Sequence, residues 1–237
     1  MVIKGRDDFY INGVSARTVG LVVDNLQPPP MAQQRHTVWS TGIDADSYQD
    51  DDVFDDMEYI IPARVLCKPN DFDNSDVYAF LQAAKTLQLS KLAGKYFKVR
   101  AVAGITPQAT IRGNEVAYSI RLTIAPFKYH VSNDEITPTN GIVTNTGTRY
   151  SRPLYKITHS GACTLTVNGE VLKLENAGLT PPPSPFYVDA DRMIAYDSNG
   201  TNCTKHTTGA FPFLQPGVNT VSTTGTAVTI VGNWRDY

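Results

Sequence analysis

Residues Gly209–Gly225, GAFPFLQPGVNTVSTTG, combine two prolines and three glycines with the large apolar side chains of Phe211, Phe213 and Leu214. Such side chains favour a core. A Pro-Gly pair favours a tight turn, because proline presets φ and glycine accepts a positive φ. The stretch therefore predicts an apolar plug under a β-sandwich, a turn at Pro216-Gly217, and a strand with Asn219 and Val221 on one face.

Short β-rich runs of the same kind occupy most of the chain. Asn12-Gly13 and Asn168-Gly169 are strong signals for two-residue hairpin turns. The run EVAYSIRLTI alternates so that one face carries Val116, Tyr118, Ile120, Leu122 and Ile124. Beyond about residue 145 only short strands are predicted, at the spacing of an antiparallel β-sandwich.

One helix is predicted after Asn74 or Ser75. Val77, Phe80, Leu81 and Ala84 recur at helical spacing and form one apolar stripe. The residues from about 131 to 145 are rich in Asn, Thr, Gly and Pro, which is typical of a junction between domains. The sequence therefore predicts domains 1–137 and 138–237 in a mainly β fold.

Charge is spread unevenly along the 237 residues, whose formal net charge is −2. Eight acids and no Lys or Arg lie between Asp44 and Glu58, so the remainder carries 15 acids and 21 bases. We find no dense Lys/Arg cluster with interleaved aromatic residues, which disfavours a sequence-specific nucleic-acid surface. We also find neither an apolar run long enough to span a membrane nor a secretory signal.

Residues arranged for catalysis are not recognisable in the sequence. The four histidines occur singly, the three cysteines lack paired spacing, and the GxSxG, GxGxxG and phosphate-loop motifs are missing. We therefore predict no catalytic residues, no metal site and no cofactor. The cysteines are expected to be reduced and mostly buried.

The acidic segment suggests a calcium loop through Asp44, Asp46, Asp50 and Asp55. Its sixth position is Gln49, where a calcium-binding EF-hand requires glycine, and its twelfth is aspartate in place of glutamate. A solvated, self-repelling hairpin tip is the favoured interpretation.

A carbohydrate-binding module is the alternative function. Aromatic faces stack on sugar rings. The candidates by residue type are Trp234 and the tyrosines Tyr150, Tyr155, Tyr187 and Tyr196, of which Tyr150, Tyr155 and Trp234 are selected. Packing within the sandwich is the competing, and favoured, interpretation of these residues.

Four motifs, in chain order, resemble the distal tail protein (Dit) family of long-tailed phages and prophages, the hub of the baseplate. They are FYINGVSARTVGLVVDNLQPPP, RLTIAPFKYH, NTGTRYSRPLYKITHSGACTLTVNGE, and GAFPFLQPGVNTVSTTG with the later GNW. Each motif is weak alone, but the four in register cover nearly the whole chain. The acidic segment 44–58 matches no pattern of that family.

The resemblance implies an N-terminal, β-sandwich-like domain with one helix that forms a homohexameric ring, and a galectin-like C-terminal β-sandwich. It implies a structural hub that joins the tail-tube protein to the tail-tip (tail-associated) protein and to receptor-binding or other baseplate proteins. DNA would pass through the lumen of the ring. The implied location is the tail tip of the virion, assembled in the host cytoplasm and without membrane insertion.

The segment from Gln33 to Cys67 has two β-like flanks around a polar tip. We therefore predict an extended hairpin arm that contacts the next protomer or faces the lumen. The residues expected to act there are Asp50, Asp51, Asp52, Asp55 and Asp56. An acidic lumen would repel DNA phosphates.

Overall fold

A computed structural model describes residues 7–23, 25–40, 46–66, 74–108, 115–174 and 183–237; of 37–40, 46–52, 66 and 108 it describes the backbone alone. Contacts divide the chain into a first unit, Met1–Tyr129 with Tyr237, and a second unit, His130–Asp236. The boundary predicted at 137/138 falls within the second unit, because the change in composition marks the loop that follows the division.

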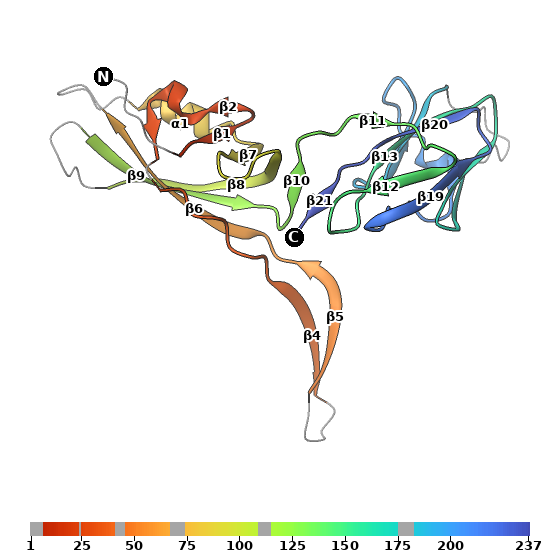
Figure 1. The fold of residues 1–237 in the computed structure, drawn as a ribbon, viewed down its shortest axis with the longest axis horizontal. Coiled ribbons are helices and arrows are strands. Elements are labelled where there is room, and N and C mark those ends of the chain that lie inside the picture. The colour runs from red at the N-terminus through yellow and green to blue at the C-terminus, as the bar shows by residue number, and fades with distance from the viewer. Residues whose placement is uncertain (1–6, 24, 41–45, 67–73, 109–114, 175–182) are drawn as a thin grey trace. The chain divides into compact units, whose positions relative to one another are not determined.

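The first unit is a curled antiparallel sheet with one helix packed on it (Figure 1). Its strand order is β2-β1-β7-β8-β9-β6-β3. The strands are β1 (Phe9–Ile11), β2 (Val14–Ser15), β3 (Leu21–Val22), β6 (Met57–Leu66), β7 (Thr86–Leu89), β8 (Lys95–Gln108) and β9 (Glu115–Ile124). Buried residues from β1 and β7 share one core with those of β6 and β9.

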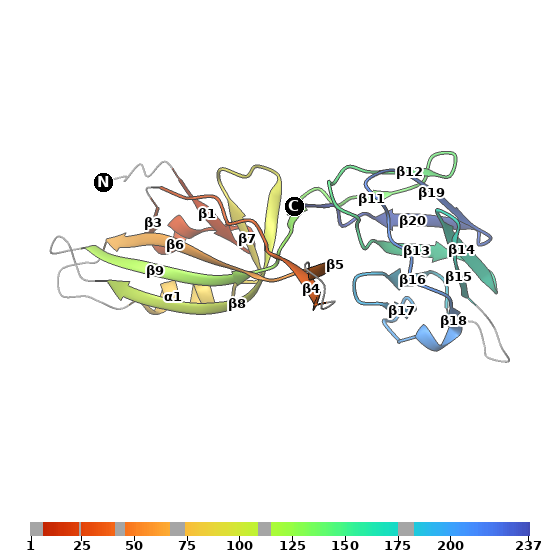
Figure 2. The ribbon, with the colours of Figure 1, turned by 90° about the horizontal axis from the view of Figure 1, so that it is seen from below.

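Strand β9 lies between β6 and β8 and pairs with both (Figure 2). The predicted alternation is confirmed, since Val116, Tyr118, Ile120, Leu122 and Ile124 are all buried. The intervening Ala117, Ser119, Arg121 and Thr123 are partly or fully exposed. We call this side the open face of β6, β9 and β8. On β6 it carries Glu58, Ile60 and Pro62, which pair with Thr123, Arg121 and Ser119.

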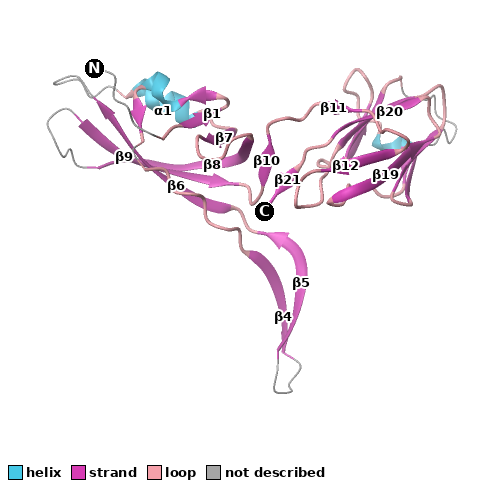
Figure 3. Cartoon of the chain, in the orientation of Figure 1, coloured by secondary structure: helices cyan, strands magenta, loops and turns pink. Residues whose placement is uncertain are grey.

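The predicted helix is α1 (Ser75–Gln82), and among the described residues it is the sole α-helix (Figure 3). Asn74 is its N-cap residue. Val77 and Leu81 are buried, while Phe80 and Ala84 pack against the same core from partly buried positions. Asn12-Gly13 forms the predicted turn between β1 and β2, with positive φ at both residues. A short 3-10 helix, η1 (Ala16–Val19), follows β2.

The arm is a separate two-stranded sheet of β4 (Gln34–Ser40) and β5 (Asp46–Phe54). The sequence predicted one arm from Gln33 to Cys67, with the acidic segment at its polar tip. That prediction is wrong: acidic β5 is itself the returning strand, and β6 belongs to the main sheet. A ladder with β4 supplies partners for the backbone of β5 whatever the charge of its side chains.

The second unit packs two antiparallel sheets around one core. The first, in the order β11-β20-β13-β16-β17, contains β11 (Glu135–Ile136), β13 (Leu154–Thr158), β16 (Phe186–Asp189), β17 (Ile194–Tyr196) and β20 (Ala227–Val231). The second, in the order β12-β19-β14-β15-β18, contains β12 (Ile142–Asn145), β14 (Cys163–Val167), β15 (Glu170–Leu174), β18 (Thr207–Thr208) and β19 (Gly217–Thr223). The short elements β10 (Lys128–His130), η2 (Thr204–His206) and β21 (Arg235–Asp236) complete the described set. The mainly β prediction is confirmed, and the galectin-like description remains a prediction.

The stretch Gly209–Gly225 folds as predicted except at one residue. Leu214 is fully buried and Phe211 packs against the core, but Phe213 is 37% exposed and is not part of the plug. Gly217 has φ +86° and begins β19, with Asn219 and Val221 facing inward.

Buried Asn219 clamps the turn that starts β19. Its Oδ1 accepts hydrogen bonds from Gln215 N (2.8 Å) and from Asn168 Nδ2 (2.8 Å). Its Nδ2 donates to the carbonyls of Gln215 (2.8 Å) and Gly217 (2.9 Å). One amide therefore links the Pro-Gly turn to the hairpin turn at Asn168.

We expect Asn219→Ala to lower the free energy of unfolding of the second unit by about 2–4 kcal/mol, since it strands buried polar groups. Urea denaturation followed by circular dichroism measures this. Thr220→Ala, at the exposed neighbouring position of β19, should change stability by less than about 0.5 kcal/mol. Equal stability of the two variants would contradict the clamp.

Candidate functional site

The candidate functional site is the base of the arm, where β5 passes into β6. Asp55 Oδ1 lies 2.5 Å from Arg35 Nη2, and Asp56 Oδ1 lies 3.7 Å from Arg100 Nε. Asp55 N also donates to Gln33 O (2.9 Å). These exposed ion pairs contribute little stability, but they fix how the two acids lie at the base of the arm.

The other acids of the predicted arm lie on β5. Asp50 is opposite His36 in the ladder with β4, and Asp51 and Asp52 follow it. Their side chains lie outside the described ones, as does Asp44. The structure therefore places Asp55 and Asp56 in separate ion pairs at the base of the arm and gives no contact for the other three side chains.

Three aromatic rings pack together beside these ion pairs. Phe54, the last residue of β5, lies 5.3 Å from Phe127 and 5.7 Å from Tyr237, between ring centroids and in edge-on arrangements. Such pairs each contribute about 0.5–1.5 kcal/mol beyond the area they bury. They hold the end of β5 against the body of the first unit.

An apolar groove of about 300 Å³ lies at the same place. Its walls include Pro28, Pro29 and Pro30, with Met57, Phe97 and Tyr237. Met31 also lines it and is 86% exposed, the most exposed large apolar side chain among the described residues. An apolar groove with an exposed methionine at its rim is the kind of surface that binds another apolar surface.

Polar contacts hold Leu26 and Gln27, the residues that lead into the wall formed by Pro28, Pro29 and Pro30. Leu26 N donates to Asp7 Oδ2 (2.6 Å), Lys91 Nζ donates to Leu26 O (3.0 Å), and Tyr59 Oη donates to Gln27 O (2.5 Å). Lys91 Nζ also pairs with Asp7 Oδ2 at 2.8 Å. The segment entering the prolines is therefore tied to β6 and to the loop after β7.

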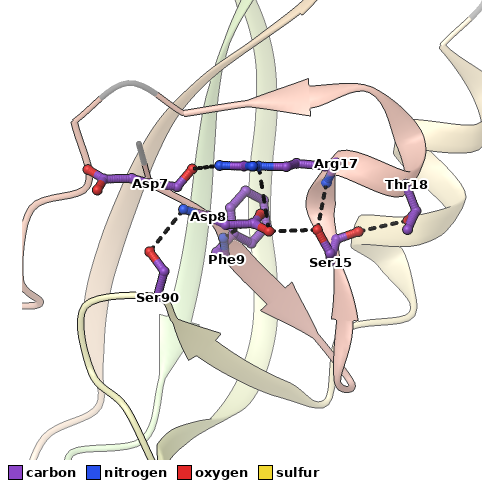
Figure 4. A network of polar contacts seen from close by, with 7 residues as sticks. All are labelled: Asp7, Asp8, Phe9, Ser15, Arg17, Thr18 and Ser90. Atoms are coloured by element: carbon purple, nitrogen blue, oxygen red, sulfur yellow. Dashed lines mark hydrogen bonds and ion pairs between the residues drawn. The ribbon is translucent and has the colours of Figure 1, made fainter. Parts of the chain in front are cut away.

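Asp8 extends this anchoring to the start of the sheet (Figure 4). Its Oδ2 accepts from Ser15 Oγ (2.6 Å), and its backbone N–H donates to Ser90 Oγ (2.9 Å). Arg17 Nη2 donates to Asp7 O (3.1 Å). Sequence patterns gave no sign of this network, because its members are single polar residues far apart in the chain.

Of the residues selected from the sequence for sugar stacking, Tyr155 and Trp234 are buried and Tyr150 is partly exposed. Tyr155 is fully buried, which raises the pKa of its hydroxyl, and Trp234 is 6% exposed within the core of the second unit. The Tyr150 ring is packed against the guanidinium groups of Arg149 (4.6 Å) and Arg235 (4.5 Å). Burial thus corrects the prediction for Tyr155 and Trp234, since stacking needs an open ring face, and the prediction for Tyr150 stays a prediction.

Among the side chains that the structure describes, no three His, Cys, Asp or Glu residues lie close enough together to bind a metal ion. Cys163 and Cys203 are buried and free, and burial raises the pKa of both thiols. Within the same described part, no helix has the length and apolar character to cross a membrane.

No protein-family model matches the chain, and no curated protein matches it. Among solved structures, the crystal structure of the Dit protein (gp 19.1) of SPP1 matches 97% of this chain and 98% of its own, with a TM-score of 0.72 and 15% identity. The chain has a Dit-like fold. The SPP1 protein is described as a paradigm of the hub adsorption apparatus in phages that infect Gram-positive bacteria. The resemblance seen in the sequence is thereby confirmed for the fold.

Tyr59 offers a test of how the proline wall is held. Burial, followed by the charge of Asp7, raises its pKa from 10.0 to about 12. The pKa of Tyr59 is higher in the folded than in the unfolded protein. Its contribution to the unfolding free energy is therefore complete below pH 10 and is lost as the pH rises toward 12. We expect Tyr59→Phe to lower the unfolding free energy at pH 8 by about 1–2 kcal/mol, through loss of the bond to Gln27.

Between pH 10 and 12 the unfolding free energy of the wild type should fall by about 2–3 kcal/mol more than that of the Tyr59→Phe variant. Urea titrations at each pH measure the difference. Tyr78→Phe, at a ring that is 39% exposed, is the matched control and should follow the wild type. Parallel pH curves for Tyr59→Phe and the wild type would contradict this role.

Proposed function

We propose that this protein is a structural hub at the tail tip of a long-tailed phage or prophage. The observation that carries the proposal is the likeness to SPP1 Dit over nearly the full length of both chains. A fold shared at 15% identity does not transfer function by itself, so the surfaces of this chain supply the further support.

The proposed assembly is a homohexameric ring formed by the first unit. A ring needs two different surfaces on each subunit that fit one another. The groove at the base of the arm supplies one apolar surface, with Met31 86% exposed. Val53 on β5, 45% exposed, supplies a further apolar contact.

The open face of β6, β9 and β8 suits the lumen of such a ring. On β9 it carries the small side chains of Ala117, Ser119 and Thr123, with Arg121 among them. At one end Arg64 and Glu115 neutralise one another at 2.9 Å. A face with few unpaired cations allows DNA to pass without being held by its phosphates.

The acidic arm is proposed to contact the next protomer or to face the lumen. Its β5 strand carries aspartates at 46, 50, 51 and 52 without a compensating base on the same strand. In either position these residues disfavour binding of DNA phosphates. At its base, the pairs of Asp55 with Arg35 and Asp56 with Arg100 leave little net charge.

The proposed partners follow from a hub role. They are further copies of the chain, the tail-tube protein, the tail-tip protein, and receptor-binding or other baseplate proteins. We propose a location in the virion at the tail tip, after assembly in the host cytoplasm, and a role without catalysis.

We expect the purified chain to sediment as a hexamer and Met31→Glu to shift it toward the monomer, because a charge would then have to be buried in the subunit contact. Analytical ultracentrifugation at matched concentrations measures the change. Met193→Glu is the matched control, since Met193 is 62% exposed but lies on the second unit. A wild type that remains monomeric at all concentrations, or equal effects of the two variants, would contradict the proposed contact.

A further inference from the structure

Asparagine followed by glycine occurs four times in the chain, at residues 12–13, 140–141, 168–169 and 199–200. Such a pair can lose ammonia without an enzyme, since glycine leaves its own backbone nitrogen unshielded by a side chain. In that reaction the glycine nitrogen must reach Cγ of the asparagine in an aligned approach. A hydrogen bond that holds either group in place therefore slows the reaction.

The side-chain amide is held in the pair at 12–13. Asn12 Oδ1 accepts hydrogen bonds from Lys85 N (2.9 Å) and Thr86 N (3.1 Å). Asn12 Nδ2 donates to Ala83 O (2.8 Å). These bonds must open before Cγ of Asn12 can turn toward the nitrogen of Gly13.

The amide of Asn168 is held in the same way. Its Nδ2 donates to Asn219 Oδ1 (2.8 Å), and its Oδ1 accepts from Thr220 N (2.9 Å). In the pair at 199–200 the attacking nitrogen is held instead, because Gly200 N donates to Asp197 O (3.0 Å). Three of the four pairs are therefore restrained by hydrogen bonds.

The pair Asn140-Gly141 has neither restraint. Asn140 is exposed, and within the described part of the chain neither its side-chain amide nor the Gly141 N–H has a hydrogen-bond partner. The turn conformation does not set this pair apart, since φ is +52° at Asn140, +52° at Asn12 and +50° at Asn168. The difference lies in the hydrogen bonds.

We propose that Asn140 is a site of spontaneous deamidation in the folded protein. The nitrogen of Gly141 forms a bond to Cγ of Asn140, the bond from Cγ to Nδ2 breaks, and ammonia leaves with the proton of the Gly141 N–H. The product is a cyclic imide. Water then adds to one of the two carbonyl carbons of the imide and opens the ring to aspartate or to isoaspartate. Solvent water is the co-reactant, and it reaches Asn140 because this residue is exposed.

The isoaspartate product lengthens the main chain of this turn by one methylene group. The turn is closed by two hydrogen bonds, from Thr139 N to Ile142 O (3.1 Å) and from Ile142 N to Thr139 O (3.0 Å). Ile142 begins β12, which lies at the edge of its sheet and pairs with β19. We therefore expect the modification to loosen this edge strand and to add a negative charge beside it. The inference is independent of the hub role, because this turn lies within the second unit.

The experiment is incubation of the purified full chain at mildly alkaline pH in water enriched in heavy oxygen, followed by peptide mapping with mass spectrometry. The heavy oxygen marks every product formed during the incubation, and the exchange of an NH group for oxygen identifies the site. We expect the Asn140 peptide to be converted at least about tenfold faster than the Asn12 and Asn168 peptides, each of which must first open two or more hydrogen bonds. It should be converted several-fold faster than the Asn199 peptide.

The same incubation in concentrated guanidinium chloride is the control for sequence, and there all four pairs should react at similar rates. Asn140→Gly is the control variant, since glycine accepts the positive φ of the turn but has no amide to lose. After incubation the melting temperature of the second unit should fall in the wild type and stay unchanged in Asn140→Gly.

The proposal is overturned if another of the four asparagines reacts as fast as Asn140 in the folded chain. It is also overturned if Asn140 stays intact in the folded chain while the same peptide is converted in guanidinium chloride. An equal loss of thermal stability in the wild type and in Asn140→Gly would contradict the effect on β12.

Discussion

Strict alternation of side chains along paired strands is the constraint on which this structure depends. Strand β9 pairs with β6 and β8, so every second side chain enters the core and the others must remain outside. An unbroken buried row from Val116 to Ile124 therefore produces an equally long open face. In the second unit the same constraint buries Tyr155 and directs Lys156 and Tyr187 outward.

Local sequence signals predicted the elements that depend on short-range physics. The hairpin turns at Asn12-Gly13 and Asn168-Gly169, the helix around Val77 and Leu81, and the Pro-Gly turn before β19 each need only a few neighbouring residues to form. The alternation in β9 was equally predictable, because every second residue from Val116 to Ile124 is apolar.

The features that the sequence could not predict depend on contacts between residues far apart in the chain. Asp7, Tyr59 and Lys91 meet at the proline segment from separate elements, and no spacing along the chain links them. Trp234 and Tyr150 looked equally suited to stacking on sugars, yet Trp234 is buried, and the guanidinium groups of Arg149 and Arg235 lie 4.6 Å and 4.5 Å from the Tyr150 ring. The acidic segment was taken for a tip because β-propensity ignores the ladder with β4.

The two units have separate cores and different surfaces. The first unit carries the arm, the apolar groove and the open face, which are features suited to contact between copies and to a channel. The second unit is a sandwich of two sheets around a core of its own. A substitution in one core therefore need not disturb the other.

The ring proposal is tested most directly by electron cryomicroscopy of the assembled protein. The predicted result is a closed sixfold ring in which β4 and β5 of each subunit lie against the neighbouring subunit or line the channel, with the open face of β6, β9 and β8 toward the lumen. A ring with Asp50 to Asp56 on the outer rim, away from any neighbour, would contradict the role given to the arm. The absence of a ring, alone or together with the other tail proteins, would contradict the hub itself.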